Sequence, residues 1–181
     1  MSDPIEQHLA RISNGSASAQ DFQALRKYVS DGGREHLYEA ITAYLELAPV
    51  VDWAIAAKFS SYGDDPMVAA AAISSAGLRG CPEEPFWTVA KQVALGAAWD
   101  SGNDARVQAL LVLHKVPGGC DAEVKNLLLT ALADESPSVR DSAAIAAQRC
   151  FGVGESDIVV GGEDGTLFQR VPHEVAEWLV S

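Results

Sequence analysis

The sequence is poor in positive charge, in aromatic residues and in long apolar runs. Its 181 residues include 13 Lys and Arg against 25 Asp and Glu, which gives a formal net charge of −12, and only 7% are aromatic. A surface with this charge repels nucleic-acid phosphates and anionic lipids, so we expect neither nucleic acid nor membrane as a partner. The longest apolar run, Met67–Ile73, is far shorter than the roughly 20 residues of a membrane span.

Cysteine is scarce as well, with Cys81, Cys120 and Cys150 widely separated in the chain. The N-terminus lacks the basic and then apolar pattern of a secretory signal. Together these features predict a cytoplasmic protein with reduced, buried thiols. The chain is 48% hydrophobic and long enough to bury a core without a disulfide or a metal, so we expect one globular domain.

What the sequence does contain is alanine, with 29 residues, and apolar spacing of helical period almost throughout. Start signals accompany this spacing: Asp3-Pro4, Asp65-Pro66 and Ser136-Pro137 each place a capping residue before a proline. The predicted helices span residues 4–12, 19–30, 34–47, 49–61, 66–78, 85–98, 104–116, 122–133 and 137–150. Short connections between them favour antiparallel neighbours.

The last thirty residues change character. Glycines at 152 and 154 end the helical pattern, and residues 157–160 and 166–170 flank the glycine-rich stretch 161–165. This pattern predicts a β-hairpin with a five-residue loop, followed by a short helix over residues 172–180.

Short segments repeat along the chain, each placing polar residues ahead of an apolar residue that opens a helical stripe. They are Asp64–Val68, Asn103–Val107 and Glu135–Val139, with a weaker fourth, Gly33–Leu37. Their last residues lie 31, 39 and 32 positions apart. A period of this size built from two helices indicates an α-solenoid.

The clearest repeat, residues 132–144, has an acidic turn, then Pro137, then Val139-Arg140, then small residues, and it resembles the HEAT-repeat family. Asp64–Ala72 matches without the arginine, and Asn103–Leu111 carries Arg106 one place early. The resemblance covers roughly residues 18–151. It implies an all-α, right-handed solenoid of about four HEAT-like helix pairs. The pairs join 19–30 with 34–47, 50–61 with 66–78, 85–98 with 104–116, and 122–133 with 137–150.

In this scheme, residues 1–17 form an N-terminal capping helix, residues 18–151 the repeats, and residues 152–181 a hairpin and a C-terminal capping helix. Terminal caps are expected because the outer face of an end repeat has no neighbour to cover it. The whole chain is then a single domain.

No catalytic, metal-binding or cofactor-binding motif emerges from the sequence. His114 falls on an apolar helix face without a nearby ligand partner, which favours a packed histidine over a metal ligand. Cys120 precedes a helix, where a thiolate nucleophile is favoured, but no base accompanies it. The glycine-rich stretch 161–165 fits a hairpin loop better than a phosphate loop. Trp99 and Trp178 lie near segment ends, where partly exposed tryptophans anchor partners, although each is more often a core residue.

The candidate binding residues are acidic and lie in the turns within the predicted helix pairs or in the tail. They are Asp31, Asp64, Asp65, Asp100, Asp104, Asp134, Glu135, Glu163 and Asp164. Stacking in register would place the turn residues along one edge. Two interpretations stay open: the acids cap the second helix of each pair and do nothing more, or they also bind a basic partner.

We therefore expect a non-catalytic protein-binding module, using a concave surface lined by the second helices. The most specific hypothesis is an immunity-type inhibitor that neutralises a basic toxin domain, such as a nuclease, through its acidic surface. This hypothesis rests on charge and on fold-level analogy. The alternatives are a scaffold or accessory subunit of an enzyme and, since some HEAT-like proteins are DNA glycosylases, a DNA-modifying enzyme. Net negative charge opposes the last of these.

Overall fold

The computed structural model of the protein describes residues 4–79, 82–159 and 171–181, and all regular structure in these residues is helical. The α-helices are α1 (Pro4–Ser13), α2 (Ala19–Ser30), α3 (Leu37–Leu47), α4 (Trp53–Ser60), α5 (Pro66–Leu78), α6 (Phe86–Leu95), α7 (Asp104–Val112), α8 (Ala122–Leu132), α9 (Pro137–Phe151) and α11 (His173–Val180). Two short 3₁₀ helices, η1 (Leu113–Lys115) and η2 (Glu155–Asp157), follow α7 and α9. The prediction of an all-α chain is confirmed for these residues.

Helix boundaries follow local backbone chemistry. Helix α5 begins where Asp65 accepts hydrogen bonds from the first free amides and Pro66 supplies a preset φ angle. Helix α3 begins three residues later than its predicted start at residue 34, because His36 adopts a left-handed conformation with φ of 58°. Helix α4 begins four residues later than expected, where Asp52 caps it, and α6 ends before Gly96, whose φ is 148°.

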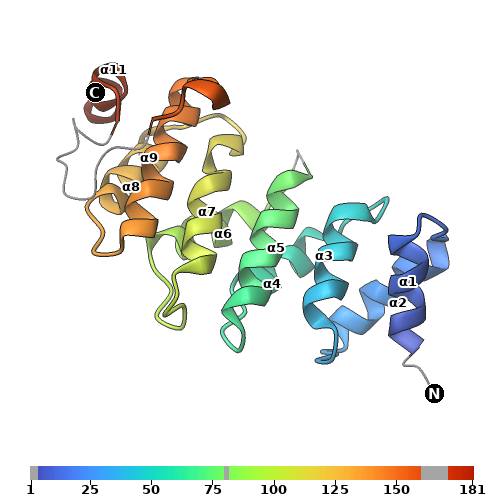
Figure 1. Ribbon diagram of the computed structural model, residues 1–181. Helices are drawn as coiled ribbons and strands as arrows, with labels where there is room; N and C mark the ends of the chain where they lie inside the picture. Colours follow the sequence, from blue (N-terminus) through green and yellow to red (C-terminus); the bar gives the residue numbers. More distant parts are fainter. Residues whose placement is uncertain (1–3, 80–81, 160–170) are drawn as a thin grey trace.

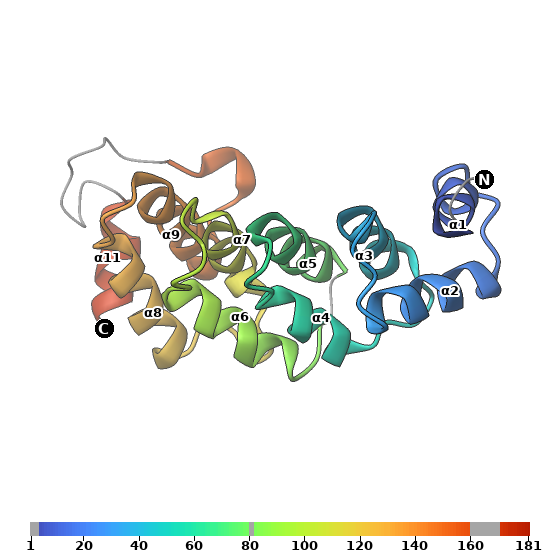
Figure 2. The ribbon, with the colours of Figure 1, turned by 90° about the horizontal axis from the view of Figure 1, so that it is seen from below.

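The helices form two rows (Figures 1 and 2). Helices α1, α3, α5, α7 and α9 make one row, while α2, α4, α6 and α8 make the other. Within the first row α3 contacts α5, α5 contacts α7, and α7 contacts α9; within the second, α4 contacts α6 and α6 contacts α8. The helices that the sequence pairs are also in contact across the rows: α2 with α3, α4 with α5, α6 with α7, and α8 with α9.

The buried core lies between the rows and along the contacts of the first row. Helix α5 is central: it packs on α3, α4 and α7, and its residues 68–73 are all buried. Four of these six residues are alanine, so this part of the helix is apolar on every side and has no polar face. Gly77 allows the closest approach, because a Cβ there would lie 2.3 Å from Cγ1 of Val112 on α7.

In the first row, a cation at the end of each of α5, α7 and α9 bonds to carbonyls near the end of the preceding helix. Lys115 Nζ donates to the carbonyl of Gly77 on α5 at 2.8 Å, and Arg149 Nη1 donates to that of Leu111 on α7 at 3.3 Å. The Arg79 guanidinium at the end of α5 donates hydrogen bonds to carbonyl oxygens at the end of α3. These belong to Leu45, Glu46 and Ala48. The three cations lie 36 and 34 residues apart and meet the negative ends of the helix dipoles.

The C-terminal region differs from the predicted hairpin. Residues 160–170, which include most of it, lie outside the described residues. In the described part up to Val159 there is no strand: residues 155–157 form the turn η2, and Val159 pairs with a side chain. The Gln148 amide accepts from the Val159 amide at 2.9 Å and donates to its carbonyl at 2.6 Å, which satisfies both groups without a partner strand. The predicted terminal helix is present as α11.

Replacement of Gly77 tests the packing of α5 on α7. Gly77→Ala places a methyl group against the buried Val112, and we expect it to reduce the free energy of unfolding by about 1–3 kcal/mol. The same replacement in a Val112→Ala background should cost clearly less, because the clash is removed. Chemical unfolding of the four proteins measures both values; equal costs in the two backgrounds would contradict this contact.

Candidate functional site

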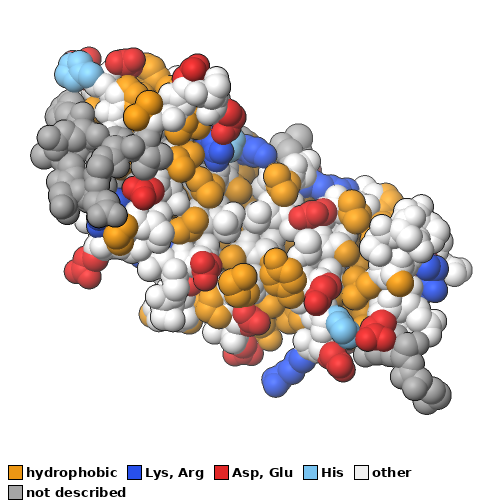
Figure 3. All heavy atoms as spheres, viewed as in Figure 1, with side chains coloured by type: hydrophobic (Ala, Val, Ile, Leu, Met, Phe, Trp, Pro, Cys, Tyr) orange, Lys and Arg blue, Asp and Glu red, His pale blue; other side chains and the backbone are white. Residues whose placement is uncertain are grey.

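The turns within the helix pairs lie along one edge of the molecule, the lower edge in Figure 1. They are residues 31–36, 61–65, 96–103 and 133–136, which connect α2 to α3, α4 to α5, α6 to α7, and α8 to α9. Each of the seven described candidate carboxylates lies in one of these turns or directly after it. Glu163 and Asp164, the two tail candidates, lie outside the described residues. We call this edge the acidic edge (Figure 3).

Two of these carboxylates serve as helix caps. Asp65 Oδ1 accepts from the amides of Met67 and Val68, at 2.9 and 3.4 Å. Asp100, which is only 3% exposed, accepts from the amides of Asp104 at 3.0 Å and Arg106 at 3.1 Å. For Asp65 and Asp100, capping of the next helix is therefore a structural role.

Asp134 combines a hydrogen bond within the turn before α9 with an ion pair. Its Oδ1 accepts from the Ser136 amide at 2.9 Å, and its Oδ2 accepts from Arg106 Nη2 on α7. Burial alone would raise the pKa of Asp134, but the guanidinium of Arg106 and the Ser136 amide outweigh burial and lower it. This pair ties the α8–α9 turn to the neighbouring helix pair, a contact that the sequence does not reveal.

The other four described carboxylates are exposed and have no hydrogen bond or ion pair with any described residue. They are Asp31, Asp64, Asp104 and Glu135. The structure therefore divides the candidates: Asp65, Asp100 and Asp134 are engaged within the fold, and one exposed acid remains at each of the four turns. These four residues make the acidic edge available to a ligand.

Most cations on the first row are already used inside the protein. Arg79, Lys115 and Arg149 bond to helix carbonyls, and Arg106 pairs with Asp134. Arg140 Nη1 also donates to the carbonyls of the α8–α9 turn, at 3.0 and 2.9 Å. These groups are poorly placed to bind phosphates, so the exposed charge of the described surface is dominated by carboxylates.

A cavity of about 520 Å³ opens on the acidic edge between the start of α3 and the α4–α5 turn. Its lining residues are Arg34, His36, Leu37, Tyr38, Glu39, Tyr62, Asp64, Asp65 and Val68. It combines two tyrosine rings with three carboxylates. Sequence reasoning identified the two aspartates but missed the tyrosines, because Tyr38 and Tyr62 come together only when α3 packs against α5 and its preceding turn.

Above this cavity, the face of the first row is apolar and hollowed (Figure 3). Exposed apolar side chains lie on it, including Tyr38, Met67 and Leu78, which are 46%, 53% and 68% exposed. Two shallow hollows of about 200 and 310 Å³ share Ser74 and Gln108 and so form one groove. We call this the α3–α9 groove.

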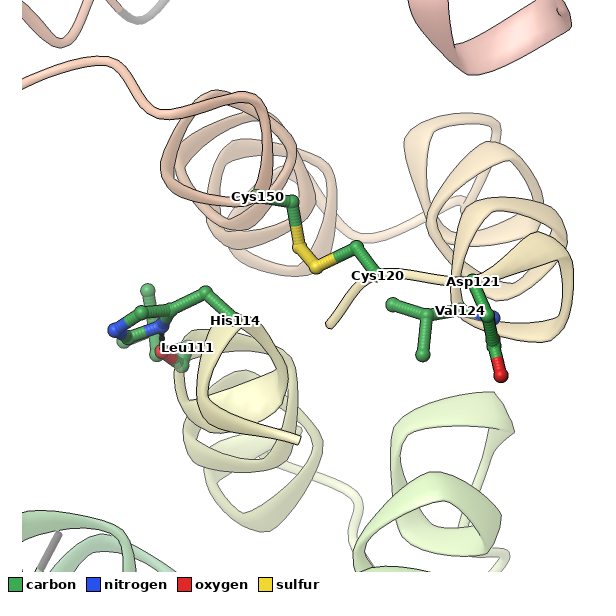
Figure 4. Close-up of a disulfide and its surroundings, with 6 residues drawn as sticks. All are labelled: Leu111, His114, Cys120, Asp121, Val124 and Cys150. Atoms are coloured by element: carbon green, nitrogen blue, oxygen red, sulfur yellow. Dashed lines mark hydrogen bonds between the residues drawn. A yellow bond between two sulfur atoms is a disulfide. The ribbon is translucent and has the colours of Figure 1, made fainter. Parts of the chain in front are cut away.

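The cysteine prediction is wrong for two of the three residues. Cys120 and Cys150 form a disulfide between the segment before α8 and the last turn of α9, with Cα atoms 5.7 Å apart (Figure 4). Their separation of 30 residues gave no pairing signal, since the contact depends on how α9 packs beside the preceding connection. The bond also removes Cys120 as a candidate thiolate nucleophile. Cys81 lies outside the described residues.

His114 is packed and hydrogen-bonded, as predicted. Its Nδ1 lies 3.0 Å from the carbonyl oxygen of Leu111, and burial lowers its pKa (Figure 4). The described residues contain no cluster of His, Cys, Asp or Glu that could hold a metal ion. Of the two tryptophans considered as partner anchors, Trp178 packs within the fold: its ring lies 5.9 Å from that of Phe151 and 4.6 Å from Lys125 Nζ. Trp99 is half-buried beside Gly63.

A buried aspartate network holds α1 on α2, and the sequence analysis did not find it. Asp21 Oδ1 lies 2.8 Å from His8 Nδ1 and 2.7 Å from Arg11 Nε. Asp21 Oδ2 accepts from the amide and the hydroxyl of Ser18, at 2.7 and 2.6 Å. The hydrogen bonds from Ser18, together with those from His8 and Arg11, hold the pKa of Asp21 far below its usual 3.8. All these groups are turned toward one another, so the network has a structural role.

Comparison of the chain with protein-family models, with curated proteins and with solved structures gave no match. The HEAT-like character therefore stays a prediction from the sequence. Among the described residues, no helix has the length and apolar character that a bilayer crossing requires. Cytoplasmic location also stays a prediction, and it loses the support of free thiols because disulfides persist mainly in oxidising compartments.

Removal of the disulfide should destabilise the protein. By the chain-entropy model, a cross-link over 30 residues contributes about 3–4 kcal/mol, and Cys150→Ser should lower Tm by roughly 10 °C. Thermal unfolding with and without a reductant measures this effect. Reductant should lower Tm of the wild type and leave Cys150→Ser unchanged; a wild-type Tm indifferent to reductant would contradict the disulfide.

Acid should destabilise the protein through Asp21. Because folding lowers its pKa, its stabilising effect is complete above the usual value of 3.8 and is lost as pH falls below it toward the folded pKa. We expect the free energy of unfolding to fall between pH 5 and pH 3, and Asp21→Asn to make this fall shallower. Urea unfolding at several pH values tests this. As a control, Asp31→Asn should leave the slope unchanged; an unaltered slope in Asp21→Asn would refute the role of the network.

Proposed function

We propose that this protein is a non-catalytic protein-binding module, a HEAT-like solenoid that binds a basic protein through its acidic edge and the adjoining α3–α9 groove. The observation that carries the proposal is the row of exposed, unpaired carboxylates Asp31, Asp64, Asp104 and Glu135, one at each of four successive turns. Spacing at repeat intervals gives a partner several contacts along one line.

The solenoid assignment is supported by the arrangement of the helices. Successive helix pairs add to two rows, and the segments that open α3, α5, α7 and α9 recur at intervals of 31, 39 and 32 residues. The three cations that bond to helix carbonyls, Arg79, Lys115 and Arg149, recur at similar intervals of 36 and 34 residues. Helices α1 and α11 cover the two ends of the described rows, as terminal caps of a repeat array do.

Electrostatics supports a basic partner. The formal charge is −12, and the cations of the first row are largely bonded to the protein itself. An exposed line of carboxylates steers an oppositely charged protein and accelerates its capture, most strongly at low salt. The exposed Tyr38 and Met67 beside the edge offer apolar contacts that turn an encounter into a stable interface.

The most specific form of the proposal is an immunity-type inhibitor of a basic toxin domain. An enzyme that acts on nucleic acid carries a basic substrate surface, and a line of carboxylates is complementary to such a surface. Binding there would exclude the substrate. A second form, a scaffold or accessory subunit, would use the same edge on a client without covering its active site. Activity of the purified partner with and without this chain separates the two.

Neutralisation of the edge tests the proposal with a decalysine peptide as the probe. We expect binding to weaken about tenfold when Asp31→Asn, Asp64→Asn, Asp104→Asn and Glu135→Gln are combined, since each exposed charge contributes roughly 0.3–0.5 kcal/mol. Wild-type affinity should fall steeply between 50 and 300 mM salt. Fluorescence anisotropy of labelled peptide measures both effects.

The matched control removes four exposed acids that lie outside these turns. It carries Glu83→Gln, Glu123→Gln, Glu174→Gln and Glu177→Gln, with the same change in net charge. This variant should lose no more than about threefold in affinity. Equal losses in the two variants would show that the peptide responds to net charge and not to the acidic edge, and would overturn the proposal.

A further inference from the structure

The cavity at the start of α3 has a composition that differs from the rest of the acidic edge. Two aromatic rings, Tyr38 and Tyr62, and three carboxylates, Glu39, Asp64 and Asp65, line a volume of about 520 Å³. The cavity is an open hollow on the acidic edge that a side chain of a partner could enter.

The carboxylates of this cavity retain acceptor capacity. Asp65 uses Oδ1 to cap α5 and leaves Oδ2 without a hydrogen bond. Asp64 and Glu39 are exposed and form no hydrogen bond or ion pair with a described residue. Tyr62 is half-buried and held by Phe59, whose ring centroid lies 5.4 Å away. The cavity thus presents fixed aromatic surface beside unpaired negative charge.

The cavity contains less positive than negative charge. Arg34 lies exposed at its rim, and His36 Nε2 lies 3.4 Å from Glu6 Oε1 on α1, which already gives this imidazole an acidic neighbour. Against three carboxylates these groups leave a net negative site. A cationic side chain entering the cavity would meet attraction from two elements, α3 and the α4–α5 turn.

We propose that this cavity receives an arginine side chain of the basic partner. A planar guanidinium can stack on a tyrosine ring and donate several hydrogen bonds to carboxylates at once, whereas a lysine ammonium is a compact, strongly hydrated charge. The Tyr62 ring, held by Phe59, and the unpaired carboxylates beside it therefore favour arginine over lysine. This inference rests on the proposed function and names the anchor of that same interface.

Tyr38 extends the site toward the face of the first row. It lines both this cavity and the neighbouring hollow, whose lining includes Ala70, Ala71 and Ser74 on α5. That hollow, of about 200 Å³, has both small side chains and the polar Glu46 and Gln108 in its lining. A partner residue next to the arginine would lie over it.

The test uses the whole chain and two peptides, Ac-Ala-Ala-Arg-Ala-Ala-NH₂ and its lysine counterpart. In ¹⁵N-resolved NMR titrations of the wild type, the arginine peptide should shift the amides of residues 36–39 and 62–65 and bind at least threefold more tightly than the lysine peptide. Tyr38→Ala and Asp64→Asn should each weaken arginine-peptide binding at least threefold. Both residues are exposed, so both variants should fold. Tyr62→Phe, which keeps the ring, should bind as the wild type does.

The matched controls are Asp31→Asn and Glu135→Gln, which remove the same charge elsewhere on the edge and should change binding less than 1.5-fold. Equal losses for Asp31→Asn and Asp64→Asn, or equal affinity for the two peptides, would overturn the arginine site. If the decalysine peptide still distinguishes the edge variant from its control, the proposed function stands without this site. Failure of both the decalysine and the arginine peptide to bind would overturn both.

Discussion

The parallel alignment of α3, α5, α7 and α9 is the constraint on which the rest of this structure depends. Each of these helices starts at the acidic edge and ends at the opposite edge, so their dipoles point the same way side by side (Figure 1). Neighbouring parallel dipoles repel unless their ends are compensated. Asp65, Asp100 and Asp134 compensate the starts, and Arg79, Lys115 and Arg149 compensate the ends. The alanines of α5 and its Gly77 then allow these helices to pack closely.

The same constraint explains why the free charge of this surface is negative. Cations at the helix ends donate to carbonyls of the preceding helix, so most of their hydrogen-bonding capacity is directed into the protein. A carboxylate that caps a helix is satisfied by one or two backbone amides. The turns contain more acidic residues than capping uses. The surplus acids Asp31, Asp64, Asp104 and Glu135 stay exposed. The capping acids and the exposed acids are therefore different residues of the same turns, so capping leaves the proposed binding residues free.

Much of this arrangement could be predicted from the sequence, because helical period, capping residues and prolines are local signals. They located every α-helix of the described residues and the acidic turns, including α5 with both its ends. What the sequence could not show depends on contacts between distant residues. The Cys120–Cys150 bond, the Arg106–Asp134 pair and the Asp21 network each join segments whose approach is set by packing. The late start of α3 follows from the left-handed conformation of His36. The presence of a histidine does not by itself predict a positive φ. The division of the acids into caps and free carboxylates also depends on geometry that residue identity alone does not provide.

Differences among equivalent turns show how a repeated edge can acquire one specific site. Asp65, Asp100 and Asp134 each lie in a turn within a helix pair, but Asp100 is buried with both oxygens bonded and Asp134 is paired with Arg106. Asp65 keeps one oxygen free and lies beside Tyr38 and Tyr62. Periodic carboxylates attract any basic surface, whereas an open hollow that combines aromatic rings with carboxylates can favour one type of side chain at one position. Long-range attraction along the edge and selective contact at the α4–α5 turn are thus separable properties, and the register of a partner on this protein would be set at that turn.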